Sequence, residues 1–400
     1  MNYAKPLNLV LPTLNINLKY KAKTATLHLA DISTIKPYLV NDAPIEEGGS
    51  ATIFTQDFKT YRFEASIKRS GCFLYINNNA CAKEVRLHGK VTPNNIDLYA
   101  FDKHLYYNKA KSRITLDNIH IDLKKFFEAK TPTQKTTKKT DTTREHSLII
   151  LGKNSHIRYD DYSLMMDSYD IEVKKNGDIQ AIASSDGDII KFMKQGETIQ
   201  LQALRIKDKV LHPLINFDGL QKGRYSLSKS GNPSLLTKGE IIIEGGVMRD
   251  FTAYNNTLAF INTLPALATL HTPGYSDEGF IITSGLIQYR MIQRDKIIFD
   301  SIYIEGQSAT IVGKGFLDLE AKTITMELQI KVARELGKAL GSIPLIGYIL
   351  TGEEQSITVG LTLKGSLTKP KVTISAGKDL LHYPLNVLKR TIEIPKQLFQ

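Results

Sequence analysis

The sequence predicts a mainly β protein with an antiparallel sheet and two or three short amphipathic helices near the C-terminus. Two observations lead to this fold class. Apolar and polar residues alternate strictly in segments such as 322–331 and 355–364, which is typical of strands with one apolar and one solvated face. Strand-like segments also follow one another without the helix of ~10–15 residues that each parallel βαβ connection requires.

The N-terminal β region covers residues 1–129. Turn signals such as Asn-Asp-Ala-Pro at 41–44 and Thr-Pro-Asn-Asn at 92–95 separate its segments. The expected strands lie at 14–20, 24–30, 51–54, 61–67, 73–76, 85–89, 96–100 and 113–123.

Cys72 and Cys81 are the two cysteines of the chain, and they flank an expected hairpin at 73–80 whose turn contains three asparagines. As cross-strand neighbours they form a disulfide if the compartment is oxidising. The alternative is two unrelated, partly buried thiols.

Residues 130–145 separate the two β-rich parts of the sequence and contain no apolar residue. Such a segment cannot offset its ordering entropy by burial, so we expect a linker or loop rich in lysine and threonine. Its five cations either stay solvated or contact an anionic surface.

Residues 146–400 resume the strand pattern. A helical period replaces it at about 250–270 and at about 332–350, and a last amphipathic piece follows at 383–399. The expected strands lie at 147–151, 156–159, 169–173, 179–183, 198–206, 223–228, 238–243, 279–290, 296–305, 308–319, 322–331, 355–364 and 370–375.

Composition and motifs exclude several classes of function. The net charge of +11 favours anionic partners, but the chain has no tryptophan and no nucleic-acid-binding motif, so we expect no nucleic acid. The nine histidines lack metal-site spacing, Gly313-Lys314-Gly315 lacks phosphate-loop spacing, and no Gly-x-Ser-x-Gly occurs. We therefore expect no enzyme, no metal and no cofactor. The chain contains no run of ~18 apolar residues, so we expect no membrane-spanning helix.

Three motifs carry a family resemblance. They are Gly-Lys-Gly-Phe-Leu-Asp-Leu at 313–319, Ile-Pro-Leu-Ile-Gly at 343–347, and Gly-Ser-Leu-Thr-Lys-Pro-Lys-Val at 365–372. The region 240–400 resembles the C-terminal part of bacterial AsmA-like proteins of the YhdP/TamB type. The resemblance implies an elongated, curved sheet that forms an open β-groove for lipid acyl chains. It also implies a membrane-associated protein of the cell envelope, in the periplasm and attached to the inner membrane through an N-terminal anchor absent from this chain.

The apolar strand faces have two interpretations: the closed core of a β-sandwich, or the groove of the AsmA-like family. The few expected helices and the resemblance favour the groove. Its predicted lipid-binding residues are Ile324, Met326, Leu328, Ile330, Ile357, Val359, Leu361 and Leu363. The next segment either caps the sheet or contacts a membrane, through Leu336, Leu340, Ile343, Leu345, Ile346, Tyr348, Ile349 and Leu350.

The predicted function is lipid transport in outer-membrane biogenesis. The protein would shield phospholipid acyl chains between the inner and outer membranes. Its expected partners are phospholipid or another anionic lipid, both membrane surfaces and envelope proteins. The alternative is a non-enzymatic scaffold or assembly factor for outer-membrane proteins, which binds them by strand addition.

Overall fold

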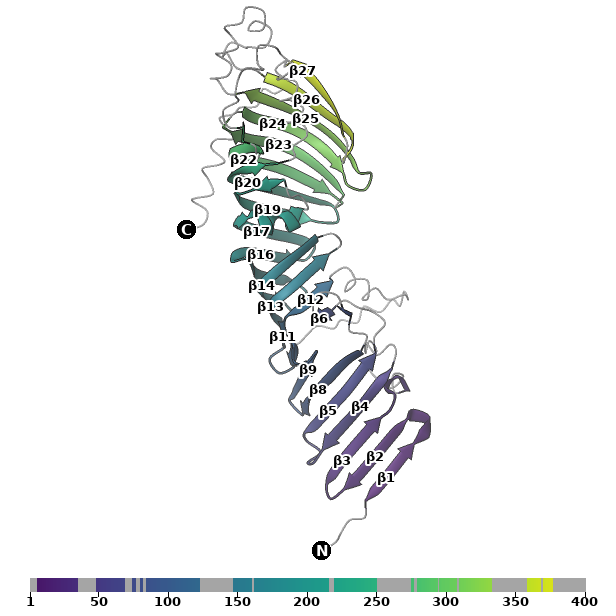
Figure 1. Ribbon diagram of the computed structural model, residues 1–400. Coiled ribbons are helices and arrows are strands. Elements are labelled where there is room, and N and C mark those ends of the chain that lie inside the picture. The colour runs from purple at the N-terminus through teal and green to yellow at the C-terminus, as the bar shows by residue number, and fades with distance from the viewer. Residues whose placement is uncertain are drawn as a thin grey trace, which may run out of the picture. The chain divides into compact units, whose positions relative to one another are not determined.

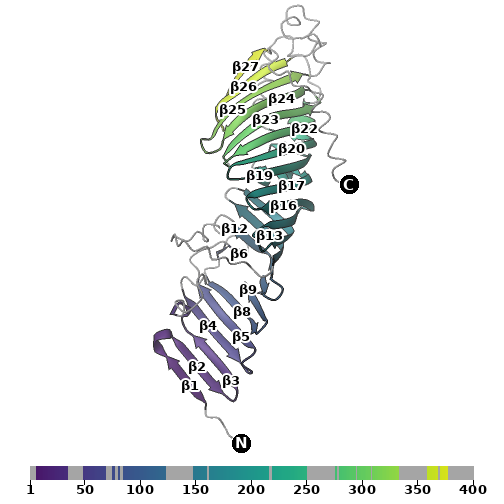
Figure 2. The ribbon, with the colours of Figure 1, turned by 180° about the vertical axis from the view of Figure 1, so that it is seen from behind.

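The structure is a computed structural model that describes residues 6–34, 48–68, 74–76, 80–81, 84–122, 147–159, 162–215, 219–249, 275–276, 279–293, 295–307, 309–332, 358–367 and 370–376. The chain divides into two compact units, Met1–Gly187 (unit 1) and Asp188–Gln400 (unit 2). Strands dominate both units (Figures 1 and 2), so the prediction of a mainly β protein is confirmed.

Unit 1 is a sheet of short strands joined mostly by tight turns. Its strands are β1 (Leu7–Leu11), β2 (Ile16–Lys21), β3 (Thr24–Leu29), β4 (Gly49–Thr55), β5 (Tyr61–Lys68), β6 (Leu74–Ile76), β7 (Ala80–Cys81), β8 (Glu84–Thr92), β9 (Asn95–Ala100), β10 (Leu105–Asn108), β11 (Arg113–Asp117), β12 (Ile119–Asp122), β13 (Leu148–Tyr159), β14 (Tyr162–Val173) and β15 (Ile179–Ser185). A 3-10 turn, Pro12–Leu14, connects β1 to β2.

Antiparallel pairing runs from β1 through β2, β3, β4, β5, β8, β9 and β10 to β11, and again from β13 to β15. The step between these two series is parallel, because β13 pairs in parallel with both β11 and β12. The prediction of an antiparallel sheet is therefore wrong where β13 pairs with β11 and β12. Parallel neighbours need a connection of about a dozen residues or more, and residues 123–146 supply it.

The single strand expected at 113–123 is broken at Asn118. This residue has a left-handed backbone with φ 53°, a conformation that Asn adopts more readily than most other residues. Its N–H donates to the carbonyl of Lys153, 3.0 Å away, which holds the bend against β13.

The hairpin expected near the cysteines is confirmed, because β6 pairs with β7 and Tyr75 lies opposite Cys81. Cys72 lies outside the described residues, so the disulfide stays a prediction. The segment 130–145 also lies outside them. It falls within unit 1, whereas the division between the compact units lies after Gly187.

Unit 2 contains longer strands and one short helix in its described part. Its elements are β16 (Asp188–Gln195), β17 (Thr198–Lys207), α2 (Asp208–Ile215), β18 (Leu220–Gln221), β19 (Arg224–Asn232), β20 (Leu236–Met248), β21 (Tyr275–Ser276), β22 (Gly279–Ile292), β23 (Lys296–Gly306), β24 (Ala309–Asp318), β25 (Thr323–Val332), β26 (Thr358–Ser366) and β27 (Pro370–Ala376).

The strands of unit 2 pair antiparallel in the order β16, β17, β19, β20, β22, β23, β24, β25, β26, β27. Figure 1 shows them side by side in one curved sheet. The short links β16–β17, β19–β20, β22–β23, β24–β25 and β26–β27 all lie at one edge, which we call the turn edge. The strands β17, β20, β23 and β25 end at the opposite edge.

The helix α2 is not among the predicted helices. Its Val210 and Leu211 are buried, and the carboxylate of Asp208 accepts hydrogen bonds from the N–H groups of Lys209 and Lys222. Two turns of helix are too short for a periodic signal in the sequence. The helices predicted at about 250–270 and about 332–350 lie outside the described residues, apart from Val332, which ends β25, and they stay predictions.

Candidate functional site

The predicted lipid-binding residues come together through the pairing of β25 with β26. Leu328 lies opposite Leu361, and Met326 lies opposite Leu363. Directly opposed residues of antiparallel strands share one face of the sheet, so this register places both pairs on the same surface. In register, Ile330 lies opposite Val359.

Burial follows the predicted alternation. Ile324, Leu328 and Ile330 of β25 are buried, as are Leu361 and Leu363 of β26, while Met326 is half-buried. The residues between them, Thr323, Thr325, Glu327, Thr362 and Lys364, are exposed. Ile357 and the predicted cap residues 336–350 lie outside the described residues, and contact of this face with lipid stays a prediction.

The same apolar face continues across unit 2. Residues opposite one another in successive strands extend it well beyond the two strands that the sequence singled out. The alternation of each strand carried this signal, but only the register joins the strands into one surface. The added residues are Phe192, Leu201, Leu227, Ile241, Ile287, Phe299, Ile302, Ile304 and Ile311.

Glycines form the floor of this face. A Cβ on Gly239 would lie 2.2 Å from Cζ of Tyr289, and a Cβ on Gly313 would lie 2.4 Å from Cδ2 of Leu328. The side chains of Tyr289 and Leu328 therefore lie over these glycines of the neighbouring strands, where any larger residue would clash with them. The pairing of β23 with β24 also shifts register opposite Gly313 and Gly315, so close strand approach accounts for this glycine pair without a phosphate loop.

Unit 1 carries an apolar face of the same kind. One cross-strand row runs from β2 to β11 through successive opposed residues. Its side chains are half-buried, and the described part of this unit contains no α-helix that covers them. The row consists of Leu18, Leu27, Ile53, Phe63, Leu98, Tyr107 and Ile114, with Gly89 beneath the ring of Phe63.

The low polarity of these faces changes the electrostatics of the tyrosines on them. Burial raises the pKa of Tyr289 to about 12. Burial, followed by the nearby Asp208 carboxylate, raises the pKa of Tyr225 to about 12 as well. Both shifts follow from burial, which disfavours the charged form of each phenol.

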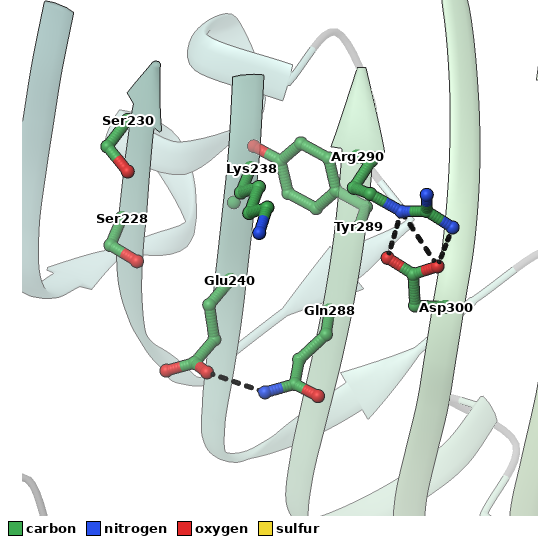
Figure 3. Close-up of a pocket in the computed structure, with 9 residues that line it drawn as sticks. Ser228, Ser230, Lys238, Glu240, Gln288, Tyr289, Arg290 and Asp300 are labelled. Carbon is green, nitrogen blue, oxygen red and sulfur yellow. Dashed lines mark hydrogen bonds and ion pairs between the residues drawn. The ribbon is translucent and has the colours of Figure 1, made fainter. Parts of the chain in front are cut away.

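Around Arg290 the opposite face of unit 2 is polar and internally paired, whereas farther along the same face Leu286 and Tyr303 are buried. The guanidinium of Arg290 donates to both carboxylate oxygens of Asp300, and the Gln288 amide donates to Glu240 at 3.1 Å. Figure 3 shows these pairs in a shallow hollow that Ser228, Ser230 and Lys238 also line. The side chains satisfy one another there, which is typical of a solvated sheet surface.

Within the described ranges, no cluster of three or more histidine, cysteine, aspartate or glutamate side chains is placed to hold a metal ion. A search of the described helices finds none with the length and apolar character needed to span a membrane.

Comparison with known protein families identifies a relationship over most of the chain. The family model described as YhdP protein matches residues 31–372 of the chain, which includes most of both units. No curated protein and no solved structure matches the chain significantly.

Proposed function

The chain belongs to the YhdP protein family, and from this premise we propose that it binds phospholipids and transfers them between the inner and outer membranes of the bacterial envelope. The acyl chains would lie on the apolar sheet faces, and the polar faces would stay in periplasmic water. The protein acts as a carrier surface and catalyses no reaction.

The observation that carries this proposal is the half-exposed apolar row of unit 1. Monomeric soluble proteins rarely leave an extended apolar surface open unless it binds something. Burying about six methylene groups at ~0.8 kcal/mol each would stabilise a bound lipid by roughly 5 kcal/mol. A face that spans many strands can therefore hold acyl chains without a closed pocket.

The proposal is tested by purifying the full chain without detergent and counting bound phospholipids by native mass spectrometry. Ile53→Asp places a carboxylate on the apolar row, and Thr52→Asp places it at the neighbouring position on the opposite face of β4. We expect Ile53→Asp to lower the number of lipids per chain and Thr52→Asp to leave it near the wild-type value.

Equal lipid content in the wild type and both variants would contradict lipid binding on this row. A wild-type protein that carries no lipid at all would instead favour the alternative, a scaffold for outer-membrane proteins. That role has its own support in β1, whose Leu7, Leu9 and Val10 are 55%, 45% and 52% exposed, and whose described pairing is with β2.

A further inference from the structure

Four turns lie at one edge of the sheet of unit 1. They connect β2 to β3, β4 to β5, β8 to β9 and β10 to β11, and the antiparallel pairing of these strands places every second link at the same edge. Figure 1 shows β2, β3, β4, β5, β8 and β9 side by side. Turn side chains are solvated, so they can meet a partner without any change in the sheet. We call this edge the lysine edge, after the five exposed lysines in and beside its turns: Lys21, Lys23, Lys59, Lys109 and Lys111.

Charge is distributed unevenly between the two edges of this sheet. The turns of the lysine edge carry one acidic residue, Asp57, against their five lysines. Within the described part of the chain, no carboxylate pairs with these five ammonium groups. Cations without an internal partner attract an anionic surface. The charged residues described at the opposite edge are mixed in sign: Asp31, Lys68, Glu84, Asp102 and Lys103.

An aromatic side chain stands at the tip of one of these turns. Phe58 is 54% exposed, and its backbone is left-handed with φ 55°. This conformation is strained for a bulky residue and persists only where the surroundings hold it. Oγ1 of Thr55 accepts from the N–H of Phe58 at 3.0 Å, and the carboxylate of Asp57 accepts from the next two N–H groups at 2.9 and 2.7 Å. A preformed turn therefore presents the ring to solvent.

Two tyrosines connect this tip to the apolar row of unit 1. The ring centroid of Tyr20 lies 6.2 Å from that of Phe58, and the hydroxyl of Tyr61 donates to the carbonyl of Phe58 at 3.0 Å. Tyr20 is two residues from Leu18 on β2, and Tyr61 is two residues from Phe63 on β5, so both share the face of the apolar row. Aromatic rings between cations and hydrocarbon are typical of surfaces that lie at a membrane interface.

We propose that the lysine edge of unit 1 binds the surface of an anionic phospholipid bilayer, with the ring of Phe58 inserted among the head groups. The lysines supply the complementary charge, and the exposed ring is buried in the interfacial layer. The apolar row begins beside this edge, which favours a lipid surface over other polyanions. An acyl chain can pass from the leaflet to the sheet there without crossing water. This inference rests on the proposed lipid-binding function and names the edge at which the chain meets the membrane.

The test measures co-sedimentation of the full chain with phosphatidylcholine vesicles that contain phosphatidylglycerol. The double variant Lys23→Gln/Lys59→Gln removes one lysine from each of two adjacent turns. Near an anionic surface each lysine contributes about fivefold in affinity, so we expect the double variant to bind roughly 25-fold more weakly. Vesicles of phosphatidylcholine alone should bind the wild type weakly.

The matched control is Lys68→Gln/Lys103→Gln, which removes the same charge from the opposite edge of the sheet. Each double variant changes one lysine with a left-handed backbone, Lys23 at φ 71° or Lys103 at φ 74°, so their conformational effects are comparable. The affinity of the control for the anionic vesicles should stay close to that of the wild type.

A second measurement follows the tip of the turn itself. The chain contains no tryptophan, so Phe58→Trp introduces a single indole, whose emission shifts to shorter wavelength when it enters the interfacial layer. The control is Leu11→Trp, because Leu11 is 39% exposed and ends β1 at the opposite edge. We expect anionic vesicles to shift the emission of Phe58→Trp and to leave that of Leu11→Trp unchanged.

Equal losses of affinity in the two double variants, or equal emission shifts in the two tryptophan variants, would overturn the assignment of this edge. Failure of the wild type to sediment with anionic vesicles would also overturn it, and binding of duplex DNA in that case would assign the lysines to nucleic acid. Native mass spectrometry separates these results from the proposed function. Bound phospholipid with no loss of affinity in Lys23→Gln/Lys59→Gln would refute the membrane-binding edge alone, whereas vesicle binding without any carried lipid would refute the carrier function alone.

Discussion

Close packing of a tyrosine over a glycine in unit 1 can be tested by adding a single methyl group at Gly152. This residue of β13 lies opposite Tyr169 of β14, whose ring is 5% exposed. A Cβ at position 152 would lie 1.9 Å from Cζ and 2.3 Å from the hydroxyl oxygen of Tyr169, far inside van der Waals contact at ~3.5 Å. Gly152→Ala therefore requires the ring to leave its place.

The magnitude follows from the contacts that the ring would lose. Overpacking a well-filled site costs ~1–3 kcal/mol. The hydroxyl of Tyr169 lies 3.3 Å from Oγ of Ser155, which is fully buried, and loss of this hydrogen bond costs ~1 kcal/mol. We expect Gly152→Ala to lower the free energy of unfolding of unit 1 by roughly 2–4 kcal/mol.

Urea denaturation of the full chain, followed by circular dichroism, measures the loss of stability. Hydrogen exchange read by mass spectrometry locates it to β13, β14 and β15. The control is the same change in a Tyr169→Ala background. That background is itself destabilised by ~3–5 kcal/mol, but there the added methyl group should have almost no further effect. Wild-type stability in Gly152→Ala, or an equal loss in both backgrounds, would refute the steric reasoning.

Two further predictions concern the apolar face of unit 2. Burial raises the pKa of Tyr289 to about 12, above its unfolded value of 10.0, so the stability that the neutral phenol contributes is complete below about pH 10 and is lost as the pH rises through about 12. When unfolding is measured against pH, a Tyr289→Phe variant should therefore become more stable relative to the wild type across this interval. A constant difference in stability between the two proteins would contradict the burial of Tyr289. Leu328→Ala should lower the free energy of unfolding by ~2–5 kcal/mol, because Leu328 is buried. Thr325→Ala, on the solvated face of β25, should lower it by less than ~0.5 kcal/mol. Equal effects of the two variants in denaturant unfolding would contradict the assignment of faces.

The strand content and the sidedness of each strand could be predicted from the sequence. In β25 and β26 the alternation around Met326 and Leu361 assigned buried and exposed faces as the structure has them. Side chains of a strand alternate by geometry, whatever the strand pairs with. A second local rule, the preference of asparagine for turns, predicted the hairpin of β6 and β7.

Which strands pair with one another could not be predicted from the sequence. The parallel pairing of β13 with β11 depends on a connection through 123–146, and nothing within either strand specifies that partner. The helix α2 was missed because its stability comes from burying Val210 and Leu211 against the sheet, whereas its own period is too short to recognise.

What the sequence determined by itself was therefore local: which segments are strands, and which face of each is apolar. What the tertiary structure decided was register, which places Leu328 opposite Leu361 and Ile330 opposite Ile311. A shift of one residue would move every side chain of a strand to its other face, so one apolar face spans several strands only when they pair in one particular alignment. That alignment depends on contacts between residues far apart in the chain, which no local pattern specifies.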